Sequence, residues 1–236
     1  MKTLLQVDNL QTFIGQYHIL QGVNLDVKEG RVTVILGRNG AGKTTTLRSI
    51  MGLTPPREGS ITYEGESIHG QSTHVIAKKG IGYVPEDQGV FADLTVEENM
   101  KIAVRKADDA TRERQELLLE LFPDLKIAWK RKGGNLSGGQ KQMLSIARAF
   151  VNDNRLLLID EPSKGLAPIV VEKVMEAILE LKKRTTIVLV EQNFLMASGI
   201  GDDVFIIDDG RTVHQDTMEA FKSNDELKKK YLGVGI

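Results

Sequence analysis

Short apolar runs alternate along this chain with longer segments in which apolar residues recur every three or four positions. A short β-branched run between turn residues predicts a buried strand, and recurrence at i, i+3 and i+4 predicts an amphipathic helix. The expected strands cover residues 32–36, 60–63, 80–84, 156–159, 186–190 and 204–207, and a hairpin at Asp209-Gly210 leads into residues 212–214.

Helical segments lie between these strands. Residues 43–51 are followed by Gly52, which suits the end of a helix. Residues 169–183 place Val174, Ile178 and Leu181 on one face of a helix. Because strands alternate with helices, the sequence predicts an α/β fold with a mostly parallel sheet and helices on both of its faces.

The pattern changes between about residues 88 and 152, where strand-like runs give way to polar helical segments. Thr95 and Glu98 have the spacing of a capping box, and residues 112–122 and 137–151 carry apolar side chains at helical spacing. We therefore expect a helical subdomain at about 88–152, inserted into a single domain that spans 1–236.

Composition and charge exclude several classes of function. The 31 Lys and Arg against 32 Asp and Glu give a net charge of −1, so nothing electrostatic favours a nucleic-acid partner. The absence of cysteine excludes a disulfide scaffold, a thiolate zinc site and a cysteine nucleophile. No apolar run approaches the ~20 residues of a membrane span, and residues 1–10 lack the features of a secretory signal. We expect a cytoplasmic protein.

A glycine-rich segment between the strand at 32–36 and the helix at 43–51 matches the phosphate-binding pattern G-x-x-x-x-G-K-[ST]. Its glycines allow backbone N–H groups to surround an anion at the positive end of a helix. A chance match in a chain of this length has a probability on the order of 1%. The expected nucleotide-binding residues are Gly37, Arg38, Asn39, Gly40, Ala41, Gly42, Lys43, Thr44 and Thr45, with Lys43 on the β- and γ-phosphates and the Thr44 hydroxyl on Mg²⁺.

Two acids end the apolar run at 156–159. Asp160 suits a divalent cation, and Glu161 suits a general base that polarises an attacking water. A strand that simply ends in a solvated acidic turn is the alternative, and the phosphate-binding segment upstream favours the functional interpretation.

A second anion site is suggested by Ser137, Gly138, Gly139 and Gln140, which open a predicted helix. A helix N-terminus leaves free N–H groups, with Ser137 as its cap. A plain helix cap beside a glycine hinge explains the same residues, and the sequence pattern alone does not decide between the two.

The chain resembles the ATP-binding cassette (ABC) ATPases over nearly its whole length. Residues 136–140 read LSGGQ, and Ser137 lies 23 positions before Asp160. The resemblance implies a P-loop NTPase core with an added antiparallel β part, and ATP and Mg²⁺ as ligands. It also implies a head-to-tail dimer with a second ABC ATPase subunit, either a homodimer or a heterodimer. Ser137, Gly138 and Gly139 of one subunit would then touch the γ-phosphate bound by the other, and ATP would hold the dimer closed.

Within that family the chain resembles the ATPases of branched-chain (hydrophobic) amino-acid uptake and their urea and amide relatives. The segments that carry this resemblance are 82–86, 94–99, 161–168, 190–193 and 231–234. It implies transmembrane permease subunits that meet Phe91 and Thr95, a position on the inner face of the cell membrane, and an indirect extracytoplasmic substrate-binding protein. The alternatives are a DNA-repair or translation ATPase, which usually has two cassettes or a coiled-coil insertion, and a slow ATP-binding regulatory module.

Two side chains depart from the family pattern at the γ-phosphate. Glu86 stands where many cassettes have glutamine, and it either ligates Mg²⁺ or swings away with Gln88 in its place. Gln192 replaces a switch histidine, and glutamine donates hydrogen bonds but carries no positive charge. We therefore expect slow turnover.

Two further departures concern the base of the nucleotide and the loop after Glu161. Ile14 stands where an aromatic usually stacks on adenine, so we expect Tyr17, in preference to Phe13, to take that role. Lys164 places a charge at a position that is usually small or apolar, and we expect it to face the dimer interface or solvent.

Overall fold

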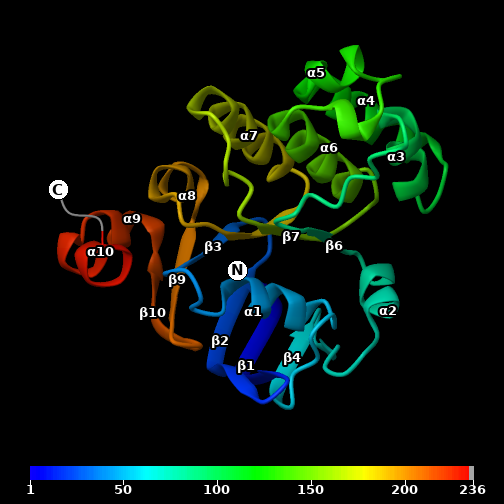
Figure 1. Cartoon of the computed structure of the whole chain (residues 1–236). Coiled ribbons are helices and arrows are strands. Elements are labelled where there is room, and N and C mark those ends of the chain that lie inside the picture. The colour runs from blue at the N-terminus through cyan, green and yellow to red at the C-terminus, as the bar shows by residue number, and fades with distance from the viewer. Residues whose placement is uncertain (234–236) are drawn as a thin grey trace.

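The computed structural model describes residues 1–233, and its centre is a six-stranded sheet in the order β10-β9-β3-β8-β7-β6 (Figure 1). All neighbouring pairs are parallel except β9 and β10, which form the predicted hairpin. The α/β fold with a mostly parallel sheet is thereby confirmed. The strands are β3 (Val32–Leu36), β6 (Ile81–Val84), β7 (Leu156–Asp160), β8 (Thr186–Val190), β9 (Asp203–Asp208) and β10 (Arg211–Thr217).

An antiparallel four-stranded sheet lies beside the first, in the order β2-β1-β4-β5. The hydrophobic pattern predicted part of β4 (Glu58–Tyr63) but not β1 (Thr3–Ile14) or β2 (Tyr17–Lys28). Irregular register, for instance between Val7 and Leu10, interrupts the two-residue period of β1. In β2, Val23, Leu25 and Val27 alternate with polar residues, a strand signal that the prediction missed. β5 is the two-residue strand Glu66–Ser67.

The helices cover both faces of the six-stranded sheet, and α3 to α6 gather at one end of the molecule, at the top of Figure 1. These four helices lie between β6 and β7 in the sequence, within the expected insertion at 88–152; the domain limits themselves stay a prediction. Val234, in the segment 231–234, lies outside the described residues. The helices are α1 (Lys43–Ile50), α2 (Thr73–Lys78), α3 (Val96–Ala103), α4 (Asp109–Leu121), α5 (Pro123–Ile127), α6 (Gly138–Phe150), α7 (Pro168–Leu181), α8 (Phe194–Ile200), α9 (Met218–Lys222) and α10 (Asp225–Leu232), with a 3₁₀ turn at Gly133–Asn135.

Two apolar cores lie on opposite faces of the central sheet. Alternate residues of β7 divide between them, since Leu157 and Ile159 pack against the helical side and Leu156 and Leu158 against the side of the antiparallel sheet. A strand buried on both faces reads as a continuous apolar run, which is why these strands were predictable. The carboxyl ends of β3, β7 and β8 meet at one edge of this sheet, where polar side chains collect.

Candidate active site

The phosphate loop, residues 37–44, runs from the end of β3 into α1, the arrangement that its sequence predicts. Gly37 has a φ of 154°, and a Cβ there would lie 2.1 Å from the Ile207 carbonyl oxygen. Gly42 has a φ of 106°, and a Cβ would lie 2.7 Å from a methyl group of Leu20. Only glycine fits both positions, because each needs a left-handed backbone in a closely packed place.

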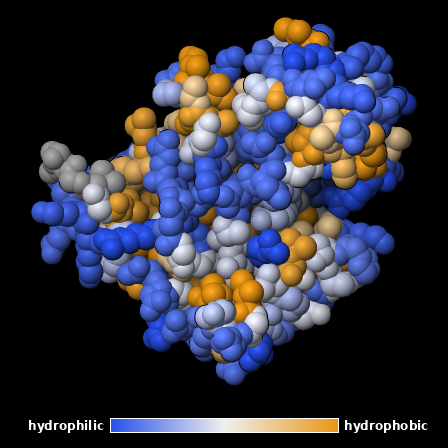
Figure 2. Space-filling model, in the orientation of Figure 1, coloured by the Kyte–Doolittle hydropathy of each residue, from blue (hydrophilic) through white to orange (hydrophobic). Residues whose placement is uncertain are grey.

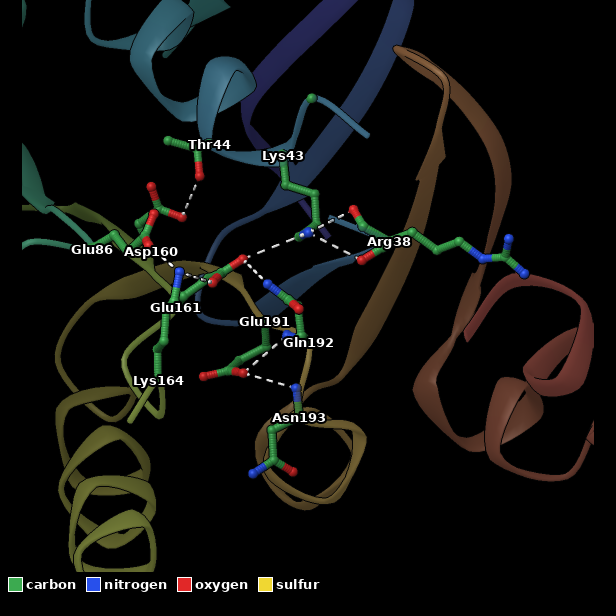
Figure 3. A network of polar contacts seen from close by, with 12 residues as sticks. Arg38, Lys43, Thr44, Glu86, Asp160, Glu161, Lys164, Glu191, Gln192 and Asn193 are labelled. Atoms are coloured by element: carbon green, nitrogen blue, oxygen red, sulfur yellow. Dashed lines mark hydrogen bonds and ion pairs between the residues drawn. The ribbon is translucent and has the colours of Figure 1, made fainter. Parts of the chain in front are cut away.

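Lys43 projects from the first turn of α1 and is almost completely buried (Figure 3). Its Nζ donates to the carbonyl oxygens of Gly37 at 3.0 Å and Arg38 at 3.1 Å, and lies 3.6 Å from Glu161 Oε1. Burial lowers the pKa of this amine, an effect that the nearby Glu161 opposes. The amine is therefore held at the floor of the loop, in position for an anion.

Thr44 and Asp160 meet across the site. The Thr44 hydroxyl donates to Asp160 Oδ1 at 3.1 Å, and the Tyr83 hydroxyl donates to Asp160 Oδ2 at 3.4 Å. Asp160 is fully buried, and burial raises its pKa to about 6 against the opposing hydrogen bond from Thr44. A cation beside this carboxylate would compensate for its burial.

These donors fit Mg²⁺, which takes oxygen ligands and is usually held by one or two carboxylates together with substrate phosphates. Within residues 1–233 no group of three or more His, Asp or Glu side chains is arranged to hold a metal by itself. The hydroxyl of Thr44 and the carboxylate of Asp160 therefore form an incomplete oxygen set that phosphate oxygens and water would complete.

Glu161 directly follows β7 in a left-handed backbone conformation, with a φ of 44°. Its Oε1 accepts a hydrogen bond from Gln192 Nε2 at 2.5 Å in addition to the ion pair with Lys43. Non-glycine residues in this conformation are uncommon and concentrate at functional sites. Glu161 thus faces Lys43, while Asp160, one residue earlier, faces Thr44.

Glu191 is a third buried acid, which the sequence analysis did not single out. It accepts hydrogen bonds from the Ser163 N–H and hydroxyl, both at 2.9 Å, and from the N–H groups of Gln192 and Asn193, both at 3.0 Å. Burial raises its pKa while these donors lower it. Glu191 thus ties the loop after β7 to the loop after β8, and an acid directly after a buried strand was the available signal.

Glu86 and Lys164 face each other at the rim of the site. Lys164 Nζ forms an ion pair with Glu86 and lies 3.8 Å from Glu161 Oε2. Gln88 points elsewhere, since its amide donates to the Gly138 carbonyl at 3.5 Å. Lys164 is 59% exposed, in agreement with the expectation of solvent contact, but its amine also lies at the site of its own chain.

The phosphate loop, Glu86, Glu161 and Lys164 line a cleft of about 310 Å³. Tyr17 is 67% exposed and does not line it, while Phe13 stacks on His18 at 4.1 Å; stacking of Tyr17 on adenine stays a prediction. Arg38 contributes its carbonyl and extends its side chain away from Lys43 (Figure 3), and Ala41 is buried beneath the loop. The lining consists of Ile14, Ile19, Asn39, Gly40, Gly42, Lys43, Thr44, Thr45, Glu86, Glu161 and Lys164.

The segment 137–140 forms the N-terminus of α6 and lies outside this lining. Ser137 and Gln140 form a capping box, in which the Ser137 hydroxyl accepts from the Gln140 N–H at 3.2 Å and Gln140 Oε1 accepts from the Ser137 N–H at 3.0 Å. Ser137 and Gly138 are exposed. A second anion site on this segment would therefore be open to solvent or to another molecule.

Comparison with known proteins decides the family. A family model described as ABC transporter matches residues 20–164. The chain belongs to this family. It is 40% identical over 232 residues to the high-affinity branched-chain amino acid transport ATP-binding protein BraG of Pseudomonas aeruginosa, a match that covers 98% of this chain and 100% of BraG. It is 37% identical to the probable branched-chain amino acid transport ATP-binding protein LivF of Archaeoglobus fulgidus, covering 98% and 99%.

A different transport role appears among the relatives at lower identity. The lipopolysaccharide export system ATP-binding protein LptB of Escherichia coli is 30% identical, with 99% of this chain and 98% of LptB covered. One solved ATP-binding cassette superimposes with a TM-score of 0.85 at 25% identity, covering 100% of both chains. A dimeric cassette bound to ADP and phosphate gives 0.80 at 26% identity, covering 91% of this chain and 99% of the other. This ABC cassette is an ATP-binding protein and an ATPase.

Proposed function

We propose that this cassette hydrolyses ATP to drive the import of branched-chain or other hydrophobic amino acids through separate transmembrane subunits. The full-length identity of 40% to BraG supports this more strongly than the 30% identity to LptB supports export. Uptake of urea or amides by the same type of system is the alternative that the sequence left open.

In this proposal the phosphate loop, the acids after β7 and Gln192 after β8 have different tasks in ATP hydrolysis. The N–H groups of the phosphate loop and the amine of Lys43 bind the phosphates, and Thr44 with Asp160 holds Mg²⁺. Bound Mg²⁺ neutralises charge on the phosphate oxygens. Glu161 accepts a proton from the attacking water, and Gln192 orients the Glu161 carboxylate through its 2.5 Å hydrogen bond.

The exposed N-terminus of α6 supports a dimer. Ser137, Gly138 and Gln140 lie outside the cleft of their own chain, so they can reach a phosphate only when it is bound by another subunit. A solved cassette of similar fold that is dimeric with ADP and phosphate bound also supports a dimer. A second cassette, either another copy or a sister subunit, would complete each site.

Permease subunits are the proposed membrane partners, and the proposed location is the inner face of the membrane. Among residues 1–233 no helix has the length and apolarity to cross a bilayer. Figure 2 shows an apolar patch over α3, the helix that carries Ile102, 59% exposed. Phe91 is 47% exposed beneath the Arg148 guanidinium, and Thr95 caps α3, so the segment proposed to meet the permease is accessible and ordered.

Replacement of Glu161 by glutamine tests this function. In the purified protein, Glu161→Gln should reduce ATP turnover at least ~100-fold while ATP binding persists, because the general base is lost and the phosphate contacts remain. In cells of the source organism that carry only this variant, uptake of labelled leucine should fall to the level of cells without the chain.

The matched control is Glu172→Gln on the exposed face of α7, which should preserve both turnover and uptake. Normal leucine uptake by cells without the chain would refute the amino-acid cargo. If urea uptake falls instead, the alternative holds.

A further inference from the structure

Glu86 and Lys164 come from different loops and meet at the rim of the nucleotide cleft. Glu86 follows β6, and Lys164 follows β7. Their ion pair is drawn in Figure 3, and both side chains belong to the lining of the cleft. The Lys164 N–H donates to the Glu161 carbonyl at 3.1 Å, which fixes the start of the Lys164 side chain close to Glu161.

Carboxylates outnumber cations around the cleft, so the partner of each carboxylate affects how the cleft receives an anion. Three carboxylates lie at the site, those of Asp160, Glu161 and Glu86, and in the described lining the only cations are Lys43 and Lys164. Lys43 already contacts Glu161 and two loop carbonyls. Arg48 lines a neighbouring pocket with Glu86, but the cation that forms an ion pair with Glu86 is Lys164.

The exposure of the pair argues against a role in folding. The Lys164 and Glu86 side chains are 59% and 37% exposed, and ion pairs in water contribute little to stability. Once a triphosphate fills the cleft and displaces water, an unpaired carboxylate at position 86 would repel it, and screening would be weaker. The pair thus matters in the nucleotide-bound protein rather than in the empty one.

We propose that Lys164 is a positioning residue that neutralises Glu86 and holds its carboxylate to the side of the cleft, so that the two side chains together act as one neutral group beside the γ-phosphate. This inference rests on the proposed use of the cleft for ATP hydrolysis. It assigns Lys164 a task within its own chain, carried out through Glu86 rather than on the phosphate itself.

A four-protein cycle tests the inference: wild type, Lys164→Gln, Glu86→Gln and the double variant. Lys164→Gln should lower kcat/KM for ATP about tenfold, mainly through KM, because the uncompensated carboxylate opposes binding. In the E86Q background the same lysine substitution should change kcat/KM less than twofold. Lys164→Arg should restore the wild-type value, since it keeps the charge.

ATP affinity gives a second readout that does not depend on turnover. In the E161Q background, calorimetric titration with ATP and Mg²⁺ should show about tenfold weaker binding for Lys164→Gln, and less than twofold weaker binding when Glu86→Gln is also present. Lys173→Gln, on the exposed side of α7, is the matched lysine control, and the melting temperatures of all variants should agree within a few degrees.

Two outcomes would overturn the inference. If Lys164→Gln has the same effect with and without E86Q, the lysine acts on the phosphate directly or through the fold. If Lys164→Gln has no effect, the pair is an ordinary surface contact. Retained turnover in Glu161→Gln alone would instead refute the proposed function of the cleft.

Discussion

At the scale of single residues, three acids close in sequence or space have different tasks because their surroundings differ. Asp160 is fully buried against two hydroxyl donors, Glu161 is buried against Lys43, and Glu191 ties two loops together with four hydrogen bonds. The left-handed turn at Glu161 separates the first two. Backbone conformation, rather than residue type, directs the two neighbouring carboxylates to different partners, Thr44 for Asp160 and Lys43 for Glu161.

Gln192 carries a prediction at this scale. Gln192→Ala removes the hydrogen bond to Glu161 and should lower kcat about tenfold with little change in KM, because the carboxylate loses its orientation. Gln192→His should raise kcat above wild type, because histidine can bring positive charge to the γ-phosphate. Steady-state kinetics measure both, with exposed Gln215→Ala on β10 as control. Fast, cooperative turnover by the wild type would contradict the slow site expected from Gln192.

At the scale of elements, caps and glycines decide where the functional helices begin. Capping boxes open α3 at Thr95 and α6 at Ser137, and Asp108 caps α4 by accepting the Thr111 N–H at 2.9 Å. α1 begins without a side-chain cap, after Gly42. Its free N–H groups are left for a phosphate, whereas α3, α4 and α6 each have a side chain that accepts one of their first N–H groups.

Gly37→Ala tests the constraint on the phosphate loop. Gly37 has a left-handed backbone, and a methyl group there would collide with the Ile207 carbonyl. We therefore expect the free energy of unfolding to fall by about 2 kcal/mol or more, which lowers Tm by roughly 4–8 °C. Gly65→Ala is the control, because Gly65 is also left-handed, with a φ of 82°, but has nothing within 4 Å. If Gly37→Ala and Gly65→Ala lower Tm equally in thermal unfolding, backbone strain alone, without the collision, accounts for the effect.

The cap of α4 predicts a pH dependence. The hydrogen bond from the Thr111 N–H, helped by Lys106, lowers the pKa of Asp108 to about 2. A lowered pKa means that the ionised side chain stabilises the folded protein above pH ~4, and that this contribution is lost as pH falls toward 2. Asp108→Asn keeps a capping group but does not titrate, so wild type should lose more stability than the variant between pH 5 and 2. An NMR midpoint near 4 for Asp108 would contradict this.

At the scale of the whole molecule, the nucleotide cleft and the exposed N-terminus of α6 are separate parts of one chain. The cleft is lined by the phosphate loop and the start of α1, by Glu86 after β6, by Glu161 and Lys164 after β7, and by Ile14 and Ile19, whereas the N-terminus of α6 lies outside its lining. In the proposed dimer, the N-terminus of α6 of one subunit covers the nucleotide in the cleft of the other. ATP would then link the two subunits.

ATP-dependent assembly is the prediction at this scale. With ATP and Mg²⁺, Glu161→Gln should elute from a sizing column as a dimer, and as a monomer without nucleotide, because bound ATP is not hydrolysed. Adding Gly138→Asp should abolish the dimer, since it places a negative charge beside the partner's phosphate. A Cβ at Gly138 meets only Leu166 at 3.9 Å, so the substitution fits the single chain. A monomer in every condition would show that this chain requires a sister subunit.

The sequence by itself determined the central strands, the phosphate loop and the acids at 160–161, because each depends on local causes: continuous apolar runs, glycine conformations and a strand end. The long strand β1 escaped prediction because register shifts interrupt its alternation, whereas the alternation of Val23, Leu25 and Val27 in β2 was readable in the sequence and was missed. The contact of Lys164 with Glu86, and the bond of Gln192 to Glu161, span 78 and 31 positions. Only the parallel order of the strands, which brings their ends to one edge, decided which of these side chains meet.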